Sequence, residues 1–124
     1  MTGNEFPVDV WRIAREMGVT VIYGEWRGRP HGMCLYPERV IILNRRRRIC
    51  QQRFDLAHEL AHYVLGVEER HTDAANRWAA ELLMPEAIFK METLVRGISA
   101  ELLVTFGVSK QAAELRARDL GYQG

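Results

Sequence analysis

Two histidines spaced four residues apart constrain this chain more than any other feature of its sequence. They lie in the stretch AHELAHYVLG, residues 57–66. Residues i and i+4 of an α-helix lie one turn apart on the same face, so His58 and His62 can direct their imidazoles at one point. The surrounding apolar residues predict a helix that is buried on most sides. Because burying two histidines beside a carboxylate is costly without a partner, a metal ion is the simplest partner for them.

Glu59 follows the first histidine and completes an H-E-x-x-H pattern. Zinc accepts neutral imidazole nitrogens as ligands and lowers the pKa of a water molecule that it binds. A carboxylate beside such a water can take its proton and pass it to a leaving amine. This is the arrangement of zinc peptidases. The pattern therefore predicts zinc on His58 and His62 with Glu59 as the catalytic base. The alternative is an ordinary amphipathic helix that carries two histidines by chance.

The rest of the chain predicts an α+β domain. Segments rich in β-branched and aromatic residues predict three strands of a small, mainly antiparallel sheet, at residues 19–26, 33–36 and 39–44. Helical spacing predicts about five helices, at residues 7–18, 51–66 and 71–85 and as a pair within about 99–121. No internal repeat or linker divides the sequence. We therefore expect residues 1–124 to form one domain, with the C-terminal helix pair integral to it.

Charge and apolar runs bear on the class of partner. A net charge of +1 gives no reason to expect nucleic acid as a partner. No apolar run approaches the ~20 residues of a membrane span, and the N-terminus lacks a signal-peptide core. Cys34 and Cys50 lack the close spacing of metal or redox motifs, so we expect reduced thiols and a cytoplasmic protein. The run of four arginines at 45–48 is typical of a solvated loop.

Longer motifs then resemble a known family. RFDLAHELAHYVLG is followed by AANRWAAELLMP, and the resemblance extends to PVDVWRIAREMGVTVIY, VIILN and LLVTFGVSKQAAELRARDLGY. These segments, in this order, closely resemble the ImmA/IrrE metallopeptidases. The resemblance implies a compact zinc-protease fold with thermolysin-like active-site helices. It also implies a protein substrate, typically a helix-turn-helix repressor of a mobile element such as a phage, or of a stress response.

The resemblance fails at the third metal ligand. A catalytic zinc usually has three protein ligands and one open position. The family implies a glutamate one helical turn before Asn76, where this sequence has Thr72. Asp73 is the first candidate for the missing ligand, His71 the runner-up and Glu69 the third. Asn76 is expected to support a ligand histidine through its ring N–H.

Two other functions stay open on these residues. Asp73 can instead be a first-turn acid that favours the helix dipole, in which case the site is degenerate. The chain would then be a non-catalytic module that docks a repressor or toxin. The last two helices also have the outline of a DNA-binding helix-turn-helix. However, Arg116 and Arg118 are offset by Glu114 and Asp119, so nucleic acid is not the expected partner.

Overall fold

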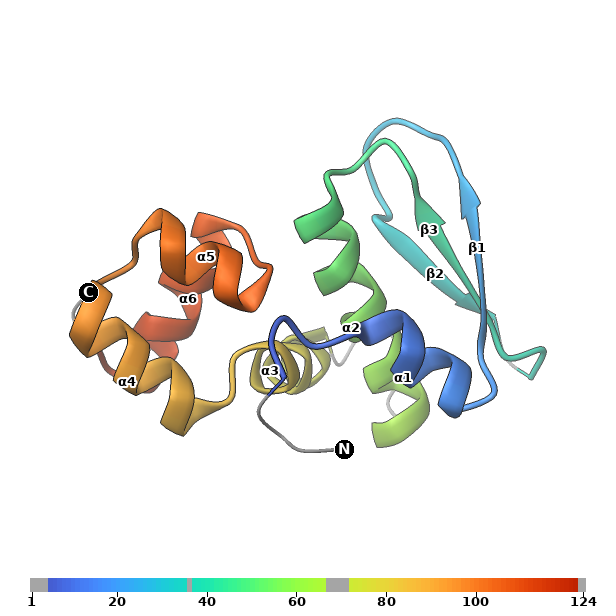
Figure 1. Cartoon of the computed structure of the whole chain (residues 1–124). Coiled ribbons are helices and arrows are strands. Elements are labelled where there is room, and N and C mark those ends of the chain that lie inside the picture. The colour runs from blue at the N-terminus through green and yellow to red at the C-terminus, as the bar shows by residue number, and fades with distance from the viewer. Residues whose placement is uncertain (1–4, 36, 67–71, 123–124) are drawn as a thin grey trace.

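The computed structural model describes residues 5–35, 37–66 and 72–122, and Figure 1 shows their arrangement. In chain order the elements are α1 (Val10–Glu16), β1 (Thr20–Gly24), β2 (Gly32–Leu35), β3 (Val40–Asn44), α2 (Ile49–Leu65), α3 (Thr72–Leu83), α4 (Glu86–Arg96), α5 (Ala100–Phe106) and α6 (Lys110–Leu120). The described residues thus form six helices and three strands. The predicted α+β class is confirmed.

The sheet is mixed, where the sequence analysis expected it to be mainly antiparallel. Its strand order is β1-β3-β2. The hairpin from β2 to β3 is antiparallel, with Cys34 opposite Ile41. The chain leaves β1, crosses to the far edge and returns, so β3 enters between the other two strands and runs parallel to β1. Strand positions follow from the local pattern, but this order depends on where the crossing connection runs.

Helix α2 lies at the centre of the molecule and packs on α1, α3 and the sheet. Ile41 and Leu43 of β3 are fully buried, whereas Ile42 between them points to the other face of the sheet and stays half-buried. The buried apolar residues of α2 are Leu56, Ala57, Leu60 and Ala61. Val64 and Leu65 lie in the last turn before Gly66 ends the helix, and they are 50% and 40% exposed.

The C-terminal helices α4, α5 and α6 gather at one end of the molecule, and α3 lies between them and the sheet (Figure 1). The hydroxyls of Ser99 and Ser109 accept hydrogen bonds from the first turns of α5 and α6. Gly107 ends α5 in the left-handed conformation, which glycine adopts without steric cost. Leu102 and Phe106 of α5 belong to the same buried cluster as Val10 and Leu56.

Arg53 of α2 connects three parts of the chain. Its guanidinium donates hydrogen bonds to the carbonyl oxygens of Val8 at 2.7 Å, Gly107 at 2.9 Å and Phe106 at 3.2 Å. Burial lowers the pKa of Arg53 from its usual value. The buried side chain therefore ties the N-terminal segment and the turn after α5 to the helix that carries the two histidines.

Within the described residues, no helix is both long and apolar enough to span a bilayer.

Candidate metal centre

Helix α2 brings together the three residues of the H-E-x-x-H pattern. One potential ligand atom from each of His58, Glu59 and His62 lies within 4.8 Å of the other two. The two imidazole centroids are 5.1 Å apart, with their planes at 74°. Glu59 and His62 are buried and His58 is half-buried. The spacing of four residues therefore does what helix geometry predicts, and it places two imidazoles and a carboxylate around one point.

Asn76 of α3 holds the ring of His58. The Nδ1 atom of His58 donates to the Asn76 side-chain oxygen, with 2.7 Å between the two atoms. This bond keeps the proton on Nδ1 and leaves Nε2 as the nitrogen available to a metal. That Nε2 atom lies 4.0 Å from the Glu59 carboxylate. The contact that the sequence analysis expected of Asn76 is present, and it depends on the packing of α3 against α2.

The environment favours the uncharged form of His58. Burial lowers the pKa of His58 below its usual value of 6.5, and the hydrogen bond to Asn76 opposes this shift. The nearby His62 lowers the pKa further through charge repulsion. A neutral imidazole is the form that binds a metal ion, so the site is prepared for one at neutral pH.

A cavity of about 460 Å³ opens over these residues. Its lining includes His58, Glu59, His62 and Asn76 on one side and residues 29–32 on the other. Gly32, at the start of β2, lies against Glu59. A Cβ atom added to Gly32 would lie 3.4 Å from the Cγ of Glu59. The edge of the sheet therefore closes one side of the site, and a small residue at position 32 leaves room for the carboxylate.

Arg47 forms part of the same wall, although the sequence analysis assigned the run at 45–48 to a solvated loop. Its guanidinium binds the Asp55 carboxylate of α2 through two hydrogen bonds of 2.8 and 3.1 Å. Arg45, Arg46 and Arg48 are exposed, so the expectation holds for three of the four residues. The exception was not visible in the run itself, because the partner of Arg47 lies eight residues further along the chain, within α2.

His31 also lines the cavity, and the sequence analysis did not consider it. Burial lowers the pKa of His31 from its usual value, and the positive charge of Arg47 lowers it further. His31 stands alone in the turn between β1 and β2, without a recognisable motif. Only the fold brings it to the same cavity as His58.

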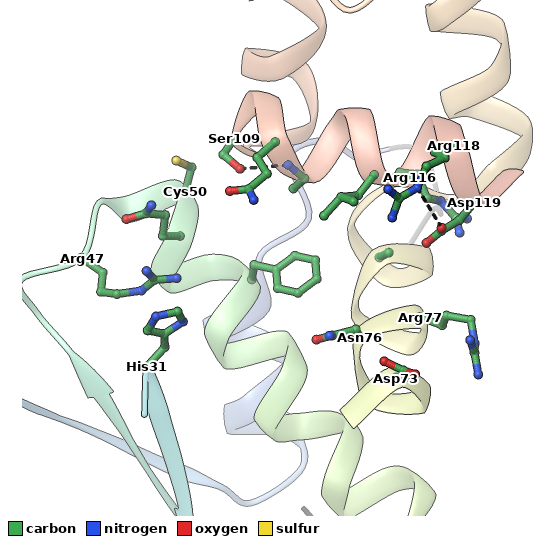
Figure 2. Close-up of a pocket in the computed structure, with 16 residues that line it drawn as sticks. His31, Arg47, Cys50, Asp73, Asn76, Arg77, Ser109, Arg116, Arg118 and Asp119 are labelled. Carbon is green, nitrogen blue, oxygen red and sulfur yellow. Dashed lines mark hydrogen bonds and ion pairs between the residues drawn. The ribbon is translucent and has the colours of Figure 1, made fainter. Parts of the chain in front are cut away.

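Asp73, the first candidate for the third ligand, lies in the first turn of α3 and is exposed. Among the described residues, the group of close ligand atoms comprises His58, Glu59 and His62, without Asp73. Figure 2 shows Asp73 on the same helix as Asn76. The other two candidates, His71 and Glu69, lie outside the described residues. Glu81, near the other end of α3, forms an ion pair with Arg116.

Known proteins resemble this chain in sequence and in fold. The family Peptidase_M78, described as "IrrE N-terminal-like domain", matches residues 14–118. Among solved structures, a Mycobacterium tuberculosis transcriptional regulator aligns with 84% of this chain at a TM-score of 0.65 and 15% identity. The chain spans 38% of the length of that protein, and at this identity the likeness concerns the fold. No curated protein matches the sequence.

Proposed function

This chain belongs to the IrrE N-terminal-like domain family of peptidases, and from that premise we propose that it is a zinc-dependent endopeptidase. The observation that carries the proposal is the grouping of His58, Glu59 and His62 within 4.8 Å on the buried central helix. The family match supports peptidase chemistry in general. We propose zinc as the metal, and the roles of individual residues and the substrate as given below.

The donor set fits zinc. His58 and His62 offer two imidazole nitrogens, and the Asn76 bond selects the tautomer of His58 that leaves Nε2 unprotonated. Asp73 remains our first choice for a third ligand, since it is three residues before Asn76 on the same helix. Its exposure means that the carboxylate must reach inward to the site or act through a bridging water. When bound, zinc would polarise the scissile carbonyl and acidify a water molecule.

In this proposal, the Glu59 carboxylate carries out both proton transfers. Glu59 is buried beside the imidazole of His58 and at the wall of the cavity, where it can accept a proton from the attacking water. The same carboxyl group then returns the proton to the leaving amine. Gly32 lies against this side chain from the sheet side and leaves room for it. The cavity over the site can hold a short stretch of an extended peptide.

We propose that the activity lies in the cytoplasm, as expected from the spacing of the two cysteines. We propose that the substrate is a helix-turn-helix repressor of a mobile element or stress response, as the family resemblance implies. Such a protease acts on one partner, so the purified protein should digest a generic substrate such as casein very little. Neither a membrane nor nucleic acid is part of the proposal.

A second function is favoured by one observation, the absence of Asp73 from the group of close ligand atoms in the described part of the chain. If the third ligand is missing, the fold would serve as a non-catalytic module that docks a repressor or a toxin. This alternative predicts substoichiometric zinc after purification and no peptide cleavage.

Two variants separate these functions. We expect one zinc per chain in the wild-type protein, measured by elemental analysis, and its loss in His58→Ala. We expect Glu59→Gln to keep the zinc and to lose cleavage of an identified substrate by at least roughly 10²–10⁴-fold, because the general base is gone. Zinc content that does not change in His58→Ala would overturn the metal site. Undiminished cleavage by Glu59→Gln would remove Glu59 from its proposed role.

A further inference from the structure

We infer that a second cavity beside the metal centre binds an apolar side chain of an extended polypeptide substrate, two to four residues from the scissile bond. This inference rests on the proposed peptidase function and adds a specificity site to it. The cavity has a volume of about 490 Å³ and lies between α2, α3 and α6 (Figure 2).

The second cavity adjoins the cavity over the metal centre. The two share His31, Arg47, Phe54 and Asn76 as lining residues. Figure 2 shows His31 and Arg47 at one side of the space and Asn76 on α3 at the other. A peptide whose scissile bond lies over His58 can therefore continue into the second cavity without leaving the protein surface.

The distance along α2 fixes which substrate residue would reach this cavity. Phe54 and Cys50, which line it, precede His58 by four and eight residues. At 1.5 Å per helical residue these offsets are about 6 and 12 Å. An extended peptide advances about 3.3 Å per residue, so it covers these offsets in about two to four residues.

Two of the four arginines that line this cavity are paired with carboxylates of the protein. Arg47 binds Asp55 at 2.8 Å, and the buried Arg116 pairs with Glu81 and donates to the Met84 carbonyl at 3.1 Å. The charge of each of these guanidinium groups is offset by a neighbouring carboxylate, so neither group is left to select a ligand by charge alone. The other charged lining residues are two arginines and two aspartates, Arg77, Arg118, Asp73 and Asp119, so their charges balance and the lining does not favour a strongly charged ligand.

Apolar surface remains for recognition. Phe54 and Ala80 contribute it from α2 and α3, and Ala112 and Leu115 contribute it from α6. Leu115 is 41% exposed although it is a large apolar residue beside a cavity, so covering it would bury apolar area. Apolar surface beside a small number of polar groups is typical of ligand pockets. We therefore assign the site to a leucine-, methionine- or phenylalanine-sized side chain of the substrate.

The test uses the zinc-loaded Glu59→Gln protein, which should bind peptides without cutting them. A library of random dodecapeptides is offered to it, and the bound peptides are identified by mass spectrometry. We expect enrichment of large apolar residues in the bound fraction. For a selected peptide, adding Ala112→Trp should fill the cavity and weaken binding by about tenfold or more, because one buried apolar side chain is worth about that factor.

Further variants distinguish loss of the apolar subsite from a general effect of the substitutions on folding. Leu115→Gln removes apolar surface at an exposed position and should weaken the same peptide by about threefold or more. Val104 is 75% exposed on α5 and lines neither cavity, so Val104→Trp and Val104→Gln should leave binding unchanged. The inference is overturned if apolar residues are not enriched, or if the enrichment survives both Ala112→Trp and Leu115→Gln.

The outcomes also separate this inference from the proposed function. Apolar enrichment that depends on Ala112 and Leu115, in a protein whose wild-type form cleaves none of the selected peptides, would support the subsite and overturn the peptidase. Cleavage by the wild-type protein without any apolar preference two to four residues from the cut would support the peptidase and overturn the subsite.

Discussion

Replacing Asn76 with alanine tests whether the hydrogen bond to His58 prepares a metal site. The bond is 2.7 Å long, and it joins the ring nitrogen that faces away from Glu59 to a residue on another helix. Without it, the Nδ1–H group loses its protein partner and the imidazole can turn out of position. Loss of a residue that orients a ligand histidine typically weakens metal binding 10–100-fold. We therefore expect Asn76→Ala to weaken zinc binding by about 1.4–2.7 kcal/mol.

Competition against a chromophoric chelator at pH 7.5 measures this effect. Asn76→Asp keeps an oxygen acceptor at the same position and should bind zinc within about threefold of the wild-type affinity. Arg77→Ala alters the exposed neighbour on α3 and serves as the control for general effects on that helix. An affinity for zinc in Asn76→Ala within twofold of wild type would refute the reasoning, since His58 would then be held without this bond.

Three further predictions concern the third ligand, the fold and pH. Asp73→Ala should weaken zinc binding at least tenfold, about 1.4 kcal/mol, whereas Glu81→Ala should not. If both variants bind zinc with the wild-type affinity, the docking alternative is favoured. Arg53→Ala removes a guanidinium that donates to three backbone carbonyls and should lower the free energy of unfolding by about 3 kcal/mol, as urea titration would show; a loss below ~1 kcal/mol would contradict its connecting role. The pKa of His58 is lowered in the folded state, so the unfolded chain binds more protons as pH falls through about 6.5. The metal-free protein should therefore lose stability between pH 7.5 and 5.5, and His58→Gln should flatten this dependence.

Local patterns were sufficient for most of the elements and for the centre of the site, whereas helix α4 was not predicted. Strands β1, β2 and β3 and helices α1, α2 and α3 occur where hydrophobic periodicity and glycine turns predict them, within a few residues. Ser99 and Ser109 cap the two C-terminal helices because capping needs only a side chain next to its own helix. These features depend on residues close in sequence, which a pattern can report.

Features that join distant parts of the chain could not be predicted in this way. The parallel pairing of β1 with β3 depends on the course of the connection before β2. The sequence predicted that Arg47 belongs to a solvated basic run, whereas in the fold it forms an ion pair with Asp55. The second cavity exists because α6 returns to lie near α2 and α3, and no local pattern specifies that return.

The sequence by itself determined that two imidazoles and a carboxylate would meet, because His58, Glu59 and His62 lie on one helix whose geometry is set by its own backbone. The tertiary structure decided what surrounds them. The tautomer of His58, the position of Asp73 and the walls of both cavities depend on how α3, β2 and α6 pack against α2, and the free energy of that packing is distributed over contacts between residues far apart in the chain.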